Sequence, residues 1–147
     1  MYAYLDRPVT SLDRGAAFLL WAIRTCTTAI IGRRCLGIAL GPGFGSHGAE
    51  GALPSFAVAM AVLVREANRT IEIMPARCCR VGEDEAILLS LLGATDDGAD
   101  ARVRAVVEML VDDDGARVAA FRAARTLAIE LLAAGLAPAT FEGTHRP

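Results

Sequence analysis

The sequence predicts an all-α fold, a single-domain bundle of about five helices, on three observations. Apolar residues recur at helical spacing in five separate stretches. The hydrophobic fraction is 54% but the aromatic fraction is only 5%, and small aliphatic residues suit closely packed helices. Residues that favour helix starts and ends flank the stretches. At 147 residues, we expect one domain over residues 1–147, with an ordered core over about 11–136 and a loose tail over 139–147.

The first helix is expected over residues 12–32, after an extended arm of residues 1–10. Ser11 is the expected N-cap, and Asp13 suits the positive first turn. The buried stripe repeats at helical spacing and consists of Leu12, Ala16, Leu19, Leu20, Ile23, Cys26 and Ile30. A second flank is expected to face water and carries Arg14, Trp21 and Arg24.

Residues 37–51 are expected to form a flexible connection because they contain six glycines. Within them, residues 43–48 match the G-x-G-x-x-G pattern of dinucleotide-binding loops. Such a loop needs a strand before it and a helix opening at its last glycine. Neither context is predicted here, so the match indicates a glycine-rich connector and no cofactor.

Two further helices are expected over residues 54–68 and 83–93. Pro54 suits the first position of a helix, and the acidic residues 83–85 suit the positive end of the next one. Gly93 is a natural C-terminal stop. Both helices are apolar on nearly all sides, which is typical of the most buried members of a bundle.

The last two helices are expected over residues 98–111 and 116–134. Asp97 is the expected N-cap of the first, in which Asp100 and Arg104 have the spacing of a supporting ion pair. Gly135 is expected to end the second helix.

Composition excludes several chemistries. All fifteen Lys/Arg positions are arginine, so no lysine is present for a Schiff base or a Walker motif. The net charge is −2, but residues 83–114 carry ten acidic residues against two arginines. That acidic centre would repel a phosphate backbone, so we expect no nucleic-acid partner.

The N-terminus lacks the basic and apolar segments of a signal peptide, which favours a cytoplasmic location with reduced thiols. Residues 15–32 are mostly apolar, but Arg24 lies at their centre, where a charge opposes membrane insertion. We therefore expect no transmembrane segment.

The main candidate for chemistry is the adjacent pair Cys78 and Cys79. Arg77 and Arg80 flank the pair, and positive charge lowers the pKa of a thiol. Neighbouring thiols could also bind a soft metal, with His47 or another cysteine as a further ligand. The competing interpretation is that one or both cysteines pack as small hydrophobic side chains against the helix expected over residues 83–93. Because catalytic and metal-site spacings are missing, the sequence assigns no catalytic, cofactor or metal residue.

The stretch over residues 77–89, Arg-Cys-Cys-Arg-Val-Gly-Glu-Asp-Glu-Ala-Ile-Leu-Leu, is followed by two helices and an acidic turn. With this stretch and the two helices after it, the C-terminal half of the chain resembles small all-helical bacterial proteins. The resemblance implies a helical fold and carries no site residues.

We expect a non-enzymatic interaction or regulatory module that self-associates, with a homodimer as the commonest closed form. Two alternatives stay open. One is a thiol-based redox or soft-metal sensor that uses Cys78 and Cys79, and the other is a protein that binds a small ligand between its helices.

Overall fold

The structure is a computed structural model, which describes residues 4–139. These residues form six α-helices and two short 3-10 turns, so the all-α prediction is confirmed and the expected count of about five is one too low. The helices are α1 (Arg14–Ile31), α2 (Leu36–Ser46), α3 (Leu53–Glu66), α4 (Glu83–Leu92), α5 (Ala99–Leu110) and α6 (Asp114–Ala133). Apart from Ala139, the expected tail lies outside the described residues.

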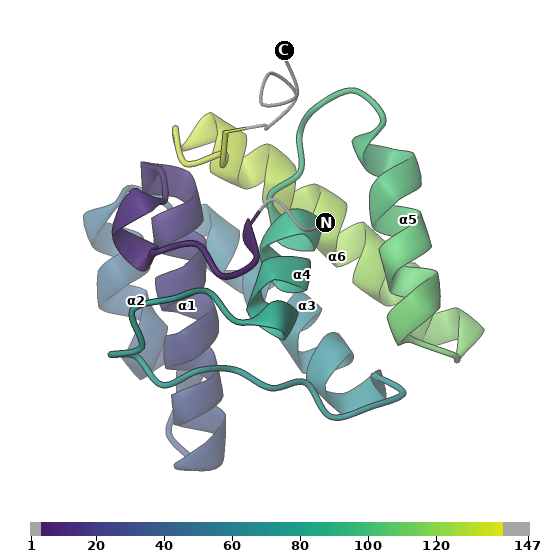
Figure 1. Cartoon of the computed structure of the whole chain (residues 1–147), viewed down its shortest axis with the longest axis horizontal. Helices are drawn as coiled ribbons and strands as arrows, with labels where there is room; N and C mark the ends of the chain where they lie inside the picture. The colour runs from purple at the N-terminus through teal and green to yellow at the C-terminus, as the bar shows by residue number, and fades with distance from the viewer. Residues whose placement is uncertain (1–3, 140–147) are drawn as a thin grey trace.

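Helix α4 is the centre of the bundle, between α1 and α5 (Figure 1). Helix α6 packs along α3, and α2 lies beside α1. Eight of the ten residues of α4 are buried, of which six are apolar, as its sequence predicts, and the other two are Asp84 and Glu85. The same prediction is wrong for α3, because Val58 and Val64 stay 50% and 46% exposed. None of the helices in the described range is long and apolar enough to cross a bilayer.

The expected glycine-rich connection is in fact mostly helix α2. Leu36, Leu40 and Phe44 repeat every fourth residue, and the last two are completely or almost completely buried. Glycine is a poor helix former, but its missing side chain lets α1 approach. A Cβ on Gly43 would lie only 2.1 Å from Cη2 of Trp21 on α1. Packing against α1 therefore outweighs the low helix propensity of this segment.

Two expected N-caps are one or two residues too early. Helix α1 is capped by Asp13, whose carboxylate accepts a hydrogen bond from the N–H of Ala16 at 2.8 Å, and not by Ser11. Helix α5 begins after Gly98, which has a left-handed backbone with φ of 81°, and not after Asp97. In both cases the N-cap is the last residue before the helix whose backbone is not helical.

The expected ion pair between Asp100 and Arg104 does not form. Asp100 instead pairs with Arg125 of α6 at 2.6 Å. Arg104 lies over the ring of Phe121, with its guanidinium carbon 4.3 Å from the ring centroid. Contacts between helices have displaced a pair that the isolated helix would favour.

The described part of the N-terminal arm pairs with the segment that precedes α4. The N–H of Asp6 donates to the carbonyl of Val81, and the N–H of Val81 donates to the carbonyl of Arg7, each at 3.0 Å. Val9 continues the ladder by donating to Cys79 at 2.8 Å. Tyr4 is buried at the start of this arm, and burial raises the pKa of its hydroxyl to about 12.

Candidate functional site

The connection between α3 and α4 is the longest irregular segment of the described chain. We call residues 69–82 the cysteine loop. After α3 it crosses the front of α1 and then turns back to α4 (Figure 1). An irregular segment leaves backbone N–H and carbonyl groups without partners of its own, so other groups must satisfy them.

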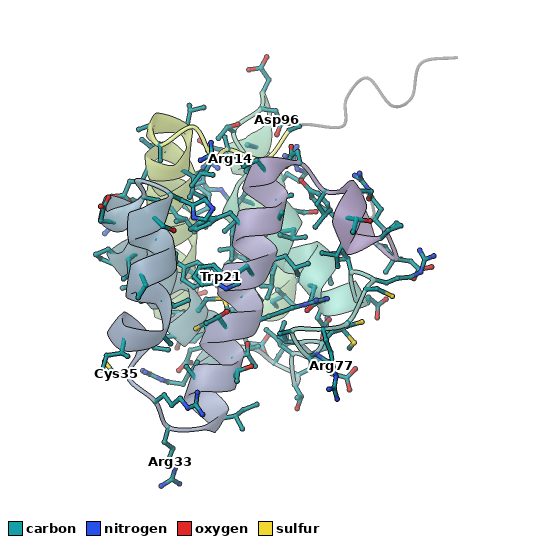
Figure 2. All side chains as sticks on the ribbon, turned by 90° about the vertical axis from the view of Figure 1, so that its left-hand side faces the viewer. Arg14, Trp21, Arg33, Cys35, Arg77 and Asp96 are labelled. Carbon is teal, nitrogen blue, oxygen red and sulfur yellow. The ribbon has the colours of Figure 1, made fainter. Side chains whose placement is uncertain are left out.

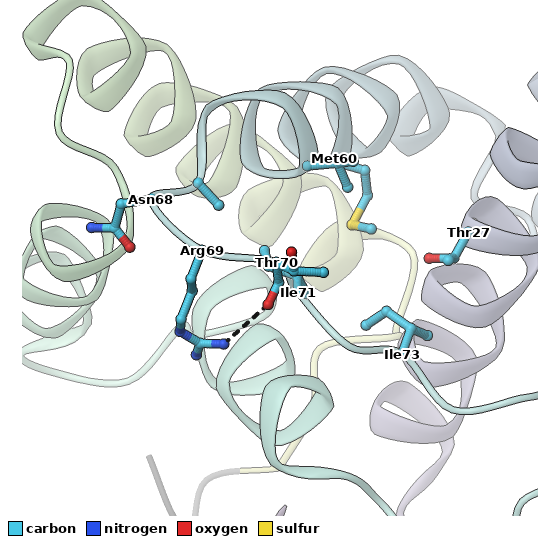
Figure 3. Close-up of a pocket in the computed structure, with 9 residues that line it drawn as sticks. Thr27, Met60, Asn68, Arg69, Thr70, Ile71 and Ile73 are labelled. Carbon is cyan, nitrogen blue, oxygen red and sulfur yellow. Dashed lines mark hydrogen bonds between the residues drawn. The ribbon is translucent and has the colours of Figure 1, made fainter.

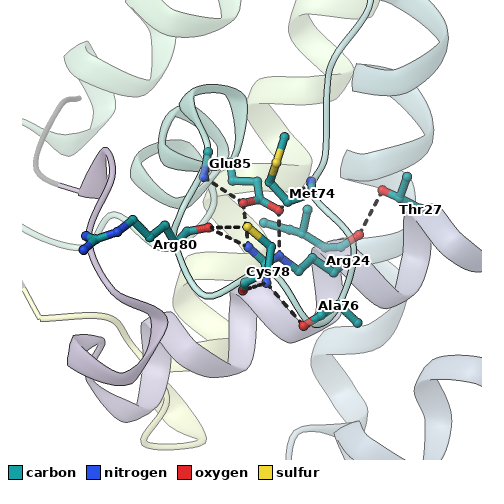
Figure 4. Close-up of polar contacts among 9 residues, drawn as sticks. Arg24, Thr27, Met74, Ala76, Cys78, Arg80 and Glu85 are labelled. Carbon is teal, nitrogen blue, oxygen red and sulfur yellow. Dashed lines mark hydrogen bonds and ion pairs between the residues drawn. The ribbon is translucent and has the colours of Figure 1, made fainter.

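A buried ion pair beneath the cysteine loop supplies many of these partners. Arg24 of α1 and Glu85 of α4 form a bidentate contact, with Nε–Oε2 at 2.8 Å and Nη2–Oε1 at 2.9 Å (Figure 4). Their side chains are only 4% and 0% exposed. Removing two charges from water is costly, and excellent geometry with further hydrogen bonds is what offsets that cost.

Arg24 supplies the loop with hydrogen-bond donors. Its guanidinium donates to the carbonyls of Cys78 at 2.9 Å, Arg80 at 3.0 Å and Ala76 at 3.4 Å. Figure 4 shows the loop wrapped around the end of this side chain. The ion pair therefore holds the turn of the loop that carries the cysteines.

Glu85 supplies the matching acceptors. Its carboxylate accepts from the N–H of Met74 at 3.0 Å and from the N–H of Gly82 at 2.9 Å. The second bond is the side-chain half of a capping box, because Glu85 is the third residue of α4 and Gly82 is its N-cap. One carboxylate thus ties together two ends of the loop and the start of α4.

The expectation that Arg24 faces water is wrong. Its flank of α1 is polar in sequence, but the cysteine loop covers it and Glu85 neutralises it. The hydrogen bond with Glu85 raises the pKa of Arg24 further above its ordinary value, against the opposing effect of burial. An arginine at the centre of an apolar stretch is the signal that points to such a buried partner.

A second ion pair holds the beginning of the cysteine loop. Arg69 contacts Asp84 with Nη2–Oδ1 at 2.7 Å, and the N–H of Glu72 donates to the same carboxylate at 2.7 Å. Burial alone would raise the pKa of Asp84, but Arg69 and this N–H together lower it below its ordinary value. The sequence assigned the acidic start of α4 to the helix dipole, whereas Asp84 and Glu85 also bind the loop.

The two cysteines of the loop reach the surface to different extents. Cys79 is exposed, and Cys78 is half-buried with its thiol donating to the carbonyl of Arg80 at 3.4 Å. Cys26 is fully buried in α1, and burial raises the pKa of its thiol to about 11. Core packing of both cysteines therefore does not fit the structure, because Cys79 is exposed, and of the two only Cys78 is half-buried.

The arginines that flank the pair are placed differently from each other. The guanidinium of Arg80 donates to the carbonyl of Asp6 in the N-terminal arm at 2.8 Å, and Arg77 is exposed. The thiol of Cys78 and the guanidinium of Arg24 both donate to the carbonyl of Arg80, so Arg24 is the arginine whose guanidinium shares an acceptor with Cys78. The sequence pointed to the two neighbours in the chain and missed this more distant residue.

His47 takes no part in the loop. Its imidazole lies 2.8 Å from the carbonyl of Gly43 and packs against Phe18, with ring centroids 4.9 Å apart. Within residues 4–139, no three His, Cys, Asp or Glu side chains are grouped so that they could hold a metal ion. The soft-metal site that combined His47 with the cysteines therefore finds no support in this geometry.

Two hollows flank the start of the loop. One has a volume of about 470 Å³ and lies between the loop and the end of α3 (Figure 3). Met60, Ile71 and Ile73 form apolar parts of its wall, and Thr27 of α1 lies at its side. The other, of about 430 Å³, lies where Arg69 meets the first turns of α4 and the end of α5, with Leu5 of the N-terminal arm at its wall. Small-ligand binding between helices stays a prediction, and the first hollow has a volume suited to it.

Comparison with protein-family models, with curated proteins and with solved structures gives no match to this chain. Neither the cysteine loop nor the ion pair beneath it can therefore be interpreted through a relative.

Proposed function

We propose that this chain is an association module that forms a homodimer through one face of α6. The observation that carries the proposal is a stripe of three large apolar side chains on that face. Val118, Ile129 and Leu132 are 51%, 66% and 58% exposed. Their spacing of eleven and three residues places them on one side of a helix. Arg122 and Thr126 are exposed between Val118 and Ile129, so the stripe has an apolar group toward each end of α6 and a polar middle. Large apolar side chains left exposed together on one helix face are typical of interfaces.

The stripe suits an antiparallel two-fold arrangement. Val118 and Leu132 are separated by fourteen residues, or about 21 Å along the helix axis. If two copies of α6 cross antiparallel near Arg125, Val118 of each copy meets Leu132 of the other. The side chain of Arg125 forms an ion pair with Asp100 of α5 and donates a hydrogen bond to the carbonyl of Ala94. Its charge is thus compensated at the crossing point.

Light scattering at tens of micromolar protein tests this proposal. We expect a dimer mass for the wild type and a monomer mass for Ile129→Arg, because a charge would be buried at the contact. Ala101→Arg adds the same charge at an exposed position of α5 and should remain a dimer. A wild-type monomer, or equal masses for the two variants, would contradict the proposal.

A second candidate function is a thiol-based sensor centred on Cys79. The exposure of this thiol, on a loop held in place by the buried ion pair of Arg24 and Glu85, favours it. A sensor cysteine must be accessible, and its thiolate is the reactive form.

Alkylation with iodoacetamide at neutral pH distinguishes a reactive thiol from one that is merely exposed. Cys35 is also exposed and provides the reference in the variant Arg33→Gln/Arg34→Gln, which removes the positive charge beside it, while Cys26 is buried and should label last. If Cys79 is a sensor, peptide mass spectrometry should show that it labels clearly faster than Cys35. Equal rates at Cys79 and Cys35 would leave Cys79 as an ordinary surface cysteine.

A further inference from the structure

A second exposed surface, separate from the α6 stripe, lies at the end of the α1–α2 hairpin. We call it the α1–α2 tip, and it consists of Ile30, Ile31, Arg33, Arg34 and Ile38. Ile31 and Ile38 are each 79% exposed, more than any other large apolar side chain described, and Ile30 is 40% exposed. Figure 2 shows Arg33 projecting from this end of the molecule, with Cys35 beside it.

The charge of the tip has one sign only. No acidic residue occurs from residue 14 to residue 49. Arg33 and Arg34 are exposed and form no ion pair within residues 4–139, whereas Arg24 and Arg69 each bind a carboxylate of α4. The tip therefore presents two uncompensated guanidinium groups beside the exposed isoleucines.

The backbone at the tip is also unusual. Arg33 has φ of 55°, in the left-handed region that favours glycine and that residues with a side chain rarely adopt. Only Asp6 shares this feature among the other described non-glycine residues. The chain thus holds an arginine where a glycine would be more stable, and this position aims its side chain outward from the end of α1 (Figure 2).

We propose that the α1–α2 tip binds the surface of a bilayer that contains anionic lipids. In this arrangement the isoleucines enter the boundary between headgroups and acyl chains, and the two guanidinium groups bind lipid phosphates. Exposed apolar side chains and basic residues on one surface are the combination that holds proteins at such interfaces. Arginine suits the role because its planar guanidinium binds phosphate in a bidentate manner.

The shape of the surface favours a bilayer over an acidic protein. The tip is the projecting end of two helices and the turn that joins them, and not a groove or a broad face (Figure 2). A stable protein interface buries about 800 Å² on each partner. A bilayer closes around a projecting tip and can cover it on all sides, whereas a protein partner covers only what its own shape matches.

Flotation of the full-length protein with lipid vesicles tests the proposal. We expect binding to vesicles of phosphatidylcholine with phosphatidylglycerol, little binding to phosphatidylcholine alone, and release in about 0.5 M salt because the screening length falls to a few Å. The variant Arg33→Gln/Arg34→Gln should bind about 25-fold more weakly, since each basic residue near an anionic surface contributes about fivefold. The variant Ile31→Ser/Ile38→Ser should bind at least about tenfold more weakly.

Matched controls separate the tip from general charge and hydrophobicity. Arg14→Gln/Arg65→Gln makes the same change in charge at exposed positions away from the tip and from the α6 stripe, and Val58→Ser/Val64→Ser makes a similar double apolar change on α3. Both should bind like the wild type. The variant Ile129→Arg, designed to separate the α6 dimer, should keep its preference for anionic vesicles, so the two proposals can fail independently.

Two results would overturn the inference. One is a folded wild type, helical by circular dichroism, that does not float with anionic vesicles, which would leave an acidic protein as the partner of the tip. The other is equal loss of binding in the tip variants and their controls.

Discussion

Arg24 lies within α1 and Arg33 lies just after its end. The two arginines are only nine positions apart in the chain, but they have opposite environments. Arg24 is buried, and its guanidinium is shared between Glu85 and three carbonyls of the cysteine loop. Arg33 is exposed on a left-handed backbone and binds no carboxylate in the described chain. The difference shows that one residue type can stabilise the fold in the middle of a helix and be left available for binding just beyond its C-terminal end.

The largest expected effect comes from removing the buried charge. Arg24→Met should lower the free energy of unfolding by about 3–5 kcal/mol, because Glu85 would remain buried without a counter-charge. Urea denaturation measures this loss. Arg34→Met removes an exposed charge at the tip and should cost less than about 0.5 kcal/mol.

A double-mutant cycle sharpens the same comparison. Adding Glu85→Gln to Arg24→Met removes the isolated charge, so the double variant should be more stable than the sum of the two single losses implies. If the two losses simply add, Arg24 and Glu85 act independently and the described network is not the source of stability.

Two glycines of α2 test how this helix, which carries Ile38 of the tip, is packed against α1. Gly43→Ala should destabilise the protein by about 1–3 kcal/mol, because the new methyl group would overlap the ring of Trp21. Gly37→Ala meets only Sγ of Cys35, at 3.8 Å, and should stabilise α2 by about 0.5–1 kcal/mol. Trp21 is the only tryptophan, so its fluorescence should change in the first variant and not in the second. Changes of the same sign in both variants would contradict the close contact of α1 with α2.

A smaller effect is expected at Arg33. Arg33→Gly should raise the free energy of unfolding by about 1 kcal/mol, because glycine adopts the left-handed conformation without the steric cost of a side chain. Thermal unfolding measures this gain, and Arg34→Gly should not show it. If the variant is more stable and also binds anionic vesicles less well, then Arg33 lowers the stability of the fold and increases its binding to vesicles.

The smallest expected effect is the response to acid at Asp84. Its pKa is lowered in the folded protein, so its ionised form stabilises the fold above the ordinary pKa of 3.8. This contribution is lost as the pH falls below that value toward the pKa in the folded state. The difference in stability between the wild type and Asp84→Asn should therefore shrink from about pH 5 to about pH 3. Arg69 is 45% exposed, and solvent screening keeps the effect small. A constant difference over this range would show that Asp84 is not stabilised by ionisation.

Local patterns were enough to predict the helices whose apolar stripes and stops agree. Helices α4, α5 and α6 begin and end within two residues of the expected positions. The same reasoning failed for α2, since its four glycines have low helix propensity and its stability comes from contact with α1. At the candidate site the sequence identified Cys78, Cys79 and the loop that carries them, but not the ion pair that holds the loop.

The sequence by itself determined the all-α class, the central position of α4 and the exclusion of lysine chemistry, because these depend on residue periodicity and composition. Only the tertiary structure decided that Glu85 is the partner of Arg24. The apolar stretch around Arg24 indicates that it needs a buried partner, but the two residues are 61 positions apart and nothing local identifies Glu85. It also decided which apolar residues stay exposed. Ile31 and Val118 have the same character as core residues, and what separates them is whether another helix covers their face.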